Sequence, residues 1–149
     1  MLKGINALLN ADVLYALRAM GHGDDLIIAD TNFPSDSVAR ETVLGELLRI
    51  DASAAEVVRA VLSIYPIDTF VEDAAGRMEV VGEPKTILPV MDEVQAEVSA
   101  VGGPNPMIPI ERYAFYERAK EAFAVIQTGE RRFYGCFALR KGVIAPEEE

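Results

Sequence analysis

The chain of 149 residues holds one histidine, one cysteine and no tryptophan. The scarcity of histidine and cysteine limits the covalent cross-links and the metal sites that it can form. Because a disulfide needs two thiols, Cys136 alone excludes an internal disulfide framework, and it allows no cysteine-only metal site. His22 and the scattered carboxylates also lack the clustering of a zinc site. We therefore expect a reducing, cytoplasmic setting and no bound metal.

Basic residues are scarce too, because 14 lysines and arginines stand against 24 aspartates and glutamates. The resulting net charge of −10 repels nucleic-acid phosphates, so we expect no nucleic-acid partner. No run reaches the roughly 18 apolar residues that span a bilayer, and Asn6, Asn10 and Asp12 interrupt the N-terminal leucines. We therefore expect a soluble protein with no signal peptide and no membrane contact.

Apolar residues are abundant, at 50% of the chain, which is enough to build a core without disulfide staples. This share is consistent with buried subunit faces, and equally with an α/β core whose strands are covered on both sides. The length fits one domain over residues 1–149, with a frayed acidic tail at 145–149.

Apolar residues at helical spacing alternate with short β-branched runs, which predicts a single α/β domain. Helices are predicted from a cap at Asn10 or Asp12 to Met20, from a cap at Asp51 or Ser53, with Glu56 completing a capping box, to Pro66, from 88 to before Gly102 and Gly103, and over 112–123. Strands are predicted at 26–30, within 43–50, at 69–73 and 77–82 around a turn at 74–76, near 104–112, and as two strands in 124–144 joined by a turn at 128–130. Residues 31–37 are predicted as a loop.

The stretch AMGHGDDLIIADTNFP combines His22, set between two glycines, with Asp30 at the end of a predicted strand. An imidazole can both give and take protons near neutral pH, and flanking glycines allow a ligand to approach the backbone closely. Asp30 could fix the tautomer of that imidazole or bind a sugar hydroxyl at the crevice beyond the strand. Alternatively, the glycines are an ordinary helix stop and Asp30 caps the next loop.

Other chemical groups give weaker signals. GHGDD lacks the lysine and the spacing of a phosphate-binding loop, and a lone cysteine in a strand is usually a packing residue. Arg112, Tyr113, Tyr116 and Tyr134 could bind a polyhydroxylated ligand through hydrogen bonds and stacking, although aromatics at helical spacing are more often core residues.

Four segments together resemble the L-fucose mutarotase and D-ribose pyranase family: MGHGDDLIIADTNFP, PIDTFVE, ERYAFYERAKEAFAVIQTGE and YGCFALRKGVI. They cover roughly half of the chain in the expected order. FYERAKEAF and the later Tyr-Gly pair are more similar to the fucose mutarotase branch.

The resemblance implies a mixed β-sheet with helices packed on its faces, and an isomerase that needs neither a redox cofactor nor a metal. It also implies a homo-oligomeric ring, commonly a decamer among the bacterial members, with the monosaccharide site near a subunit boundary. By the same resemblance His22 is the proton donor and Asp30, Asp68, Arg112, Tyr134 and Gly135 belong to the sugar site. Tyr116 matches the aromatic of the FYER segment.

Mutarotation moves one proton off the anomeric hydroxyl and delivers another to the ring oxygen, so positioned acid/base groups suffice. We expect His22 to act as acid or base, with the carboxylate at the end of the strand positioning it. Asp30, Asp68 and Arg112 would hold hydroxyls, and Tyr134 would relay a proton or orient the ring oxygen.

Cys136 stands where the family usually has the asparagine of Tyr-Gly-Asn, and a thiol is only a weak donor. This departure puts the identity of the sugar in question more than the reaction, and it leaves alternatives open. These are pyranase activity on ribose, a sugar-binding protein without turnover, and a non-catalytic assembly subunit.

Overall fold

A mixed six-stranded β-sheet organises the chain, and the computed structural model describes residues 1–149. In chain order the strands are β1 (Asp25–Ala29), β2 (Leu48–Ile50), β3 (Ala75–Met78), β4 (Ile108–Ile110), β5 (Ala124–Thr128) and β6 (Phe137–Arg140). Their spatial order is β2-β5-β1-β6-β3-β4. Strands β2, β5 and β1 are parallel, β6 is antiparallel to both of its neighbours, and β4 runs parallel to β3 at the edge.

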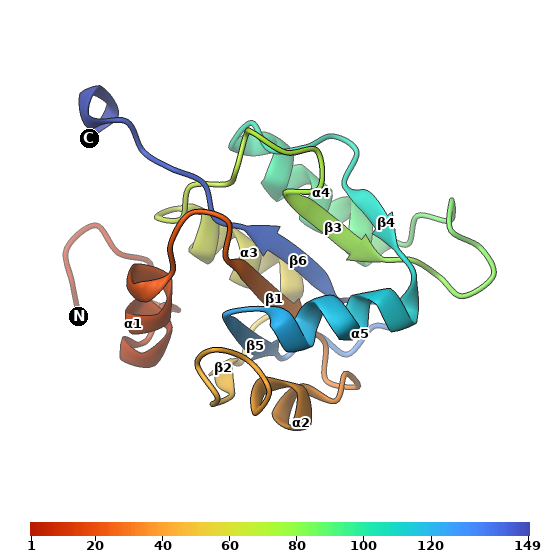
Figure 1. The fold of residues 1–149 in the computed structure, drawn as a ribbon. Coiled ribbons are helices and arrows are strands. Elements are labelled where there is room, and N and C mark those ends of the chain that lie inside the picture. Colours follow the sequence, from red (N-terminus) through yellow and green to blue (C-terminus); the bar gives the residue numbers. More distant parts are fainter.

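Helices cover both faces of this sheet (Figure 1). They are α1 (Ala11–Ala19), α2 (Ser35–Ala39), α3 (Ala54–Leu62), α4 (Pro89–Ala100) and α5 (Arg112–Glu121), with a short 3₁₀ turn at Pro146–Glu148. Helices α3 and α4 lie behind the sheet in Figure 1, and α5 and α2 lie in front. This confirms the predicted α/β architecture with helices on the faces of a mixed sheet.

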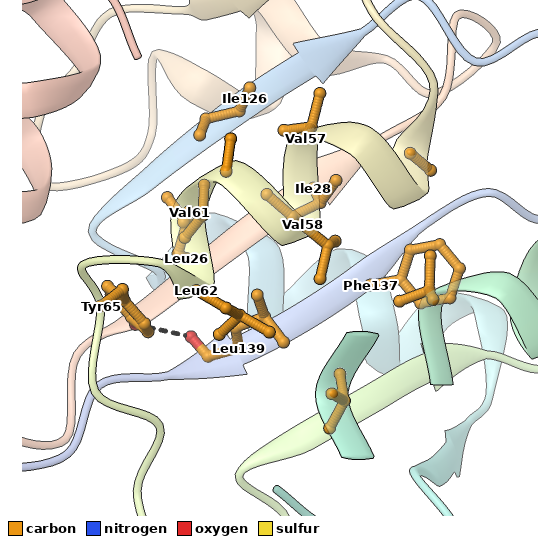
Figure 2. Close-up of a cluster of buried hydrophobic side chains, with 14 of the residues drawn as sticks. Leu26, Ile28, Val57, Val58, Val61, Leu62, Tyr65, Ile126, Phe137 and Leu139 are labelled. Carbon is orange, nitrogen blue, oxygen red and sulfur yellow. Dashed lines mark hydrogen bonds between the residues drawn. The ribbon is translucent and has the colours of Figure 1, made fainter. Parts of the chain in front are cut away.

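Successive side chains of strand β1 point to opposite faces of the sheet, and both sets are buried because helices cover both faces. Leu26 and Ile28 pack with α1, α3 and α4 in a core of 28 buried residues, whereas Ile27 and Ala29 join α2 and α5 in a second core of 13. Figure 2 shows the first core, where the Tyr65 hydroxyl donates a 2.9 Å hydrogen bond to the Leu139 carbonyl. A strand in the middle of the sheet, such as β1, therefore needs apolar residues at consecutive positions.

The predicted helix starts agree with the structure, whereas α3 ends at Leu62, before the predicted stop at Pro66. Asn10 caps α1 by accepting from the Val13 amide, and the Ser53–Glu56 capping box opens α3. Pro89 stands in the first turn of α4, where its missing N–H costs nothing. The proline-interrupted strand β4 lies at the sheet edge, the position that tolerates Pro109.

Four local predictions are wrong. Residues 69–73 form no strand, and the predicted turn at 74–76 lies largely within β3, where a Cβ on Gly76 would clash with Ile110. The predicted loop at 31–37 includes the start of α2. Finally, β5 and β6 are not joined by a tight turn, because β1 lies between them and the connection runs over residues 129–136. Sequence periodicity reports burial, and it does not report which strands are neighbours.

No helix in the structure combines the length and the apolar character needed to cross a bilayer.

Candidate active site

A cavity of about 260 Å³ opens where β1, the start of α5 and the connection 129–136 meet. It unites five of the residues singled out in the sequence, together with four that were not. Its walls are Asp30, Asn32, Phe33, Met78, Arg112, Tyr116, Phe133, Tyr134 and Cys136. The volume lies near the lower end, about 300 Å³, of small-molecule sites.

Asp30 forms the polar floor of this cavity and is only 4% exposed. Its Oδ1 accepts hydrogen bonds from the amides of Asn32 and Phe33, both at 2.9 Å, and its Oδ2 accepts one from Gly135 at 3.1 Å. The neighbouring Cys136 thiol also hydrogen-bonds with the Asp30 side chain. The three amides therefore fix the carboxylate at the floor of the cavity, where it presents acceptor oxygens.

The connection 129–136 approaches Asp30 through an unusual backbone conformation. Tyr134 has a φ of 62°, and no other non-glycine residue in the chain has a positive φ. The left-handed region is unfavourable for a bulky side chain, and such residues concentrate at functional sites. Gly135 follows, and a Cβ there would lie 2.8 Å from Glu130 Cγ and 3.3 Å from Asp30 Cβ. Tyr134 and Gly135 together bring the chain against the carboxylate.

An ion-pair network anchors the same connection. Arg132 donates to Glu130 at 2.8 Å and 3.0 Å and to Glu93 of α4 at 3.0 Å and 2.6 Å. These hydrogen bonds from Arg132 outweigh the opposing effect of burial and lower the pKa of Glu130 to about 2. The connection is thereby tied to a helix on the far side of the sheet.

Arg112 and Tyr116 form the α5 wall of the cavity. The Arg112 guanidinium donates a 3.1 Å hydrogen bond to the Tyr116 hydroxyl and stacks over the Tyr113 and Tyr116 rings. Glu111 caps the helix by accepting from the Tyr113 and Ala114 amides, which places Arg112 in the first turn. A cation, two phenols and a carboxylate thus face one small volume.

Cys136 lines the cavity immediately before β6 and is 2% exposed. Burial, together with the nearby Asp30 carboxylate, raises the pKa of the Cys136 thiol well above its ordinary value. A protonated, buried thiol is a poor nucleophile, so Cys136 contributes shape and a weak donor to the cavity.

His22 and Asp68 form a second, separate cluster. His22 Nε2 lies 3.3 Å from Asp68 Oδ2, and the imidazole packs edge-on against Phe70. Asp68 Oδ1 accepts from the Phe70 amide at 3.0 Å, and this bond, with the His22 contact, lowers the pKa of Asp68. An ionised Asp68 accepts from Nε2–H and leaves the His22 Nδ1 lone pair free.

Strand β1 separates the two clusters, because His22 precedes it and Asp30 follows it. Five residues at about 3.3 Å each put at least ~17 Å of strand between them. The expectation that Asp30 positions the imidazole is therefore wrong, and Asp68 makes that contact instead. Within one chain, no single monosaccharide reaches both His22 and Asp30.

The sequence reading missed Asn32, Phe33, Met78 and Phe133 as cavity residues. Phe133 is 74% exposed, and its position directly before the Tyr-Gly pair was the signal available in the sequence. Met78 comes from β3, which only the antiparallel pairing with β6 brings near. No group of three or more potential metal-ligating side chains gathers anywhere in the chain.

The chain matches the RbsD / FucU transport protein family over residues 3–144. It is 43% identical to the fucose mutarotase of Homo sapiens, with 97% of this chain and 95% of that protein aligned. The chain belongs to this family. The resemblance seen in the sequence is therefore confirmed.

Two crystal structures share the fold over nearly the whole chain. Protein Atu2016 is 60% identical, with a TM-score of 0.94 and 97% of each chain covered. The fucose mutarotase from Streptococcus pneumoniae, solved in complex with L-fucose, is 33% identical, with a TM-score of 0.86, and covers 97% of this chain and 100% of that one.

Proposed function

We propose that this chain is a cofactor-independent isomerase that interconverts the anomers of L-fucose. The observation that carries the proposal is the cavity, which sets the fixed Asp30 carboxylate, the Arg112 guanidinium and the Tyr116 and Tyr134 phenols around one small volume. The family and the fucose mutarotase relatives support the same activity. A free sugar with several hydroxyls matches this donor and acceptor set.

Ring opening needs one base and one acid. A base takes the proton of the anomeric hydroxyl O1, the C1–O5 bond breaks with its electron pair on O5, and an acid protonates O5. Rotation about C1–C2 and reversal of these transfers give the other anomer. Each positioned acid or base contributes about 10²–10⁴-fold.

We assign the base to His22 and the acid to Tyr134, with the carboxylate of Asp30 and the guanidinium of Arg112 holding hydroxyls. Asp68 orients the imidazole by accepting from Nε2–H. Because β1 separates His22 from the cavity of its own chain, a second copy supplies His22 to each site. Gly135 shapes the backbone beneath the sugar, and Cys136 and Tyr116 complete the walls.

Exposed aromatics support this arrangement. Phe70, 70% exposed, packs beside His22, and Phe133, 74% exposed, stands at the rim of the cavity. Large exposed apolar side chains at both ends of β1 are the kind of surface that a neighbouring subunit covers. We propose a homo-oligomeric ring, a decamer, working on a free sugar in the cytoplasm. The free thiol of Cys136 is compatible with that reducing compartment.

The test is anomeric exchange of L-fucose measured by saturation-transfer NMR. Wild type should accelerate exchange, and His22→Ala should reduce the acceleration at least a hundredfold, because the base is lost. A panel with D-ribose and D-galactose identifies the sugar, with pyranase activity on ribose as the second candidate. Cys136 in place of the usual asparagine favours one further candidate, a binding protein, which would bind sugar without accelerating exchange.

Unchanged exchange in His22→Ala would remove His22 from the mechanism. A wild-type protein that forms oligomers but neither binds nor turns over sugar would overturn the proposal in favour of a non-catalytic assembly subunit.

A further inference from the structure

The Tyr134 hydroxyl has a fixed partner outside the cavity. The backbone N–H of Val81 donates a 3.2 Å hydrogen bond to the Tyr134 hydroxyl oxygen. The segment between β3 and α4 that contains Val81 lies far from Tyr134 in sequence and was not singled out as part of the site. We infer that the Val81 N–H is a positioning group for the reaction, which holds the Tyr134 phenol and directs its proton toward the sugar.

The direction follows from the hydrogen-bond inventory of a phenol. Its oxygen accepts along lone pairs and donates through one rotatable O–H. The Val81 N–H uses an acceptor position, so the O–H turns away from Val81 and is free to point into the cavity that Tyr134 lines. As Tyr134 gives its proton to the ring oxygen, negative charge develops on the phenol oxygen. A backbone N–H already aimed at that oxygen stabilises the charge without reorganisation.

The turn that presents the N–H is rigid. Glu83 N donates to Val80 O at 2.9 Å, and Gly82 has a φ of +77°. Val81 lacks a positive φ, so this is the pattern of a type II turn with glycine in its third position. The segment is also held by the buried Arg77, whose guanidinium donates to the Pro84 carbonyl at 2.8 Å. A fixed donor therefore meets a Tyr134 whose own backbone is fixed at a φ of 62°.

The turn offers a variant that removes only the donor. Proline is favoured at the second position of a type II turn, so Val81→Pro keeps the backbone shape and deletes the N–H. Val80 is extended, as a residue before proline must be. The Val81 side chain is 60% exposed, so little packing is lost. Val81→Ala is the matched control, because it shortens the same side chain and keeps the N–H.

This inference rests on the proposed mutarotase activity and is tested in the same exchange assay at several fucose concentrations. Val81→Pro should lower kcat about tenfold with KM changed less than twofold, since the bond strengthens only as charge develops. Val81→Ala should lose less than twofold. In a Tyr134→Phe background, Val81→Pro should cause no further loss, because the oxygen that accepts the bond is gone.

Equal exchange in Val81→Pro and Val81→Ala would overturn the inference while leaving the activity standing. An equal tenfold loss in both Tyr134 backgrounds would also overturn it, because the effect would then be structural. No acceleration by wild type would overturn the proposed function and this inference together. Deuterium exchange of the peptide containing Val81 is a second measurement that needs no proline: exchange should be faster in Tyr134→Phe, and unchanged exchange overturns the inference.

Discussion

At the residue scale, Asp30 shows how a buried carboxylate is held ready for a ligand. Its two oxygens accept three backbone amides from two different segments, one directly after β1 and one at Gly135. Hydrogen bonds to an ionised acceptor are stronger than neutral ones, and burial at 4% exposure removes competing water. The same residue therefore serves the stability of the loop and the binding of a hydroxyl.

The variant Asp30→Asn tests the contribution of this carboxylate to stability. An amide nitrogen at the Oδ2 position would set an N–H donor against the Gly135 N–H, leaving a buried donor without a partner. We expect a loss of about 2–3 kcal/mol in the free energy of unfolding, measured by urea denaturation at equal protein concentration. Asp36→Asn is the matched control, because Asp36 forms only an exposed pair with Arg40 and should change stability by less than about 0.5 kcal/mol. Similar losses in both variants would contradict this account.

At the scale of elements, the connection 129–136 is the part of the chain that makes the cavity. It crosses over β1 to join β5 to β6, and the network of Glu130, Arg132 and Glu93 ties it to α4. Glu130 also accepts from the Ala54 amide in the first turn of α3 at 3.3 Å. Helices α3 and α4, which lie on one face of the sheet, thus hold the connection 129–136 that lines the cavity.

The lowered pKa of Glu130 makes this anchoring dependent on pH. Its folded-state pKa is about 2 against an ordinary value of 4.5, so the unfolded chain binds more protons between these values. Stability from this group is therefore complete above about pH 5 and is lost as the pH falls from 4.5 toward 2. Glu130→Gln should be less stable at pH 7, with a shallower decline below pH 4.5, in urea denaturation followed across that range. A slope equal to that of wild type would exclude Glu130 as its source.

At the scale of the whole molecule, the length of β1 decides how the site can be completed. The strand puts His22 and the Asp30 cavity at opposite ends of one sheet, yet the proposed reaction needs both beside one sugar. A closed ring of identical contacts would bring the His22 end of one subunit to the cavity end of the next. The monomer would then be a folded but catalytically incomplete unit.

Complementation between two defective variants tests this arrangement. Co-expressed His22→Ala and Tyr134→Phe chains, carrying different tags, should form mixed oligomers in which about a quarter of the sites combine an intact His22 with an intact Tyr134. Exchange should therefore return to about a quarter of the wild-type rate, although each variant alone is nearly inactive. No recovery in purified mixed oligomers would mean that both groups act within one chain.

Much of the fold was predictable because its signals are local. The caps at Asn10 and Ser53, the apolar run of β1 and Pro89 at the start of α4 each depend on residues within a few positions. The failures were non-local. Gly76 resembles a turn residue in sequence, but it lies in β3 because this segment pairs with β4 and β6, and a Cβ there would clash with Ile110.

The candidate site also has features that are local in sequence and features that depend on contacts between distant segments. The chemical groups of the site could be identified from the sequence, because the single histidine, the aspartate after a buried strand and the Tyr-Gly pair are local features. Their grouping depends on the folded chain, which brings Asp68 to His22, Asp30 to Gly135, and the Val81 N–H to Tyr134. The physical reason is that a strand has a fixed rise per residue, so eight positions that look close in sequence lie at opposite ends of the sheet.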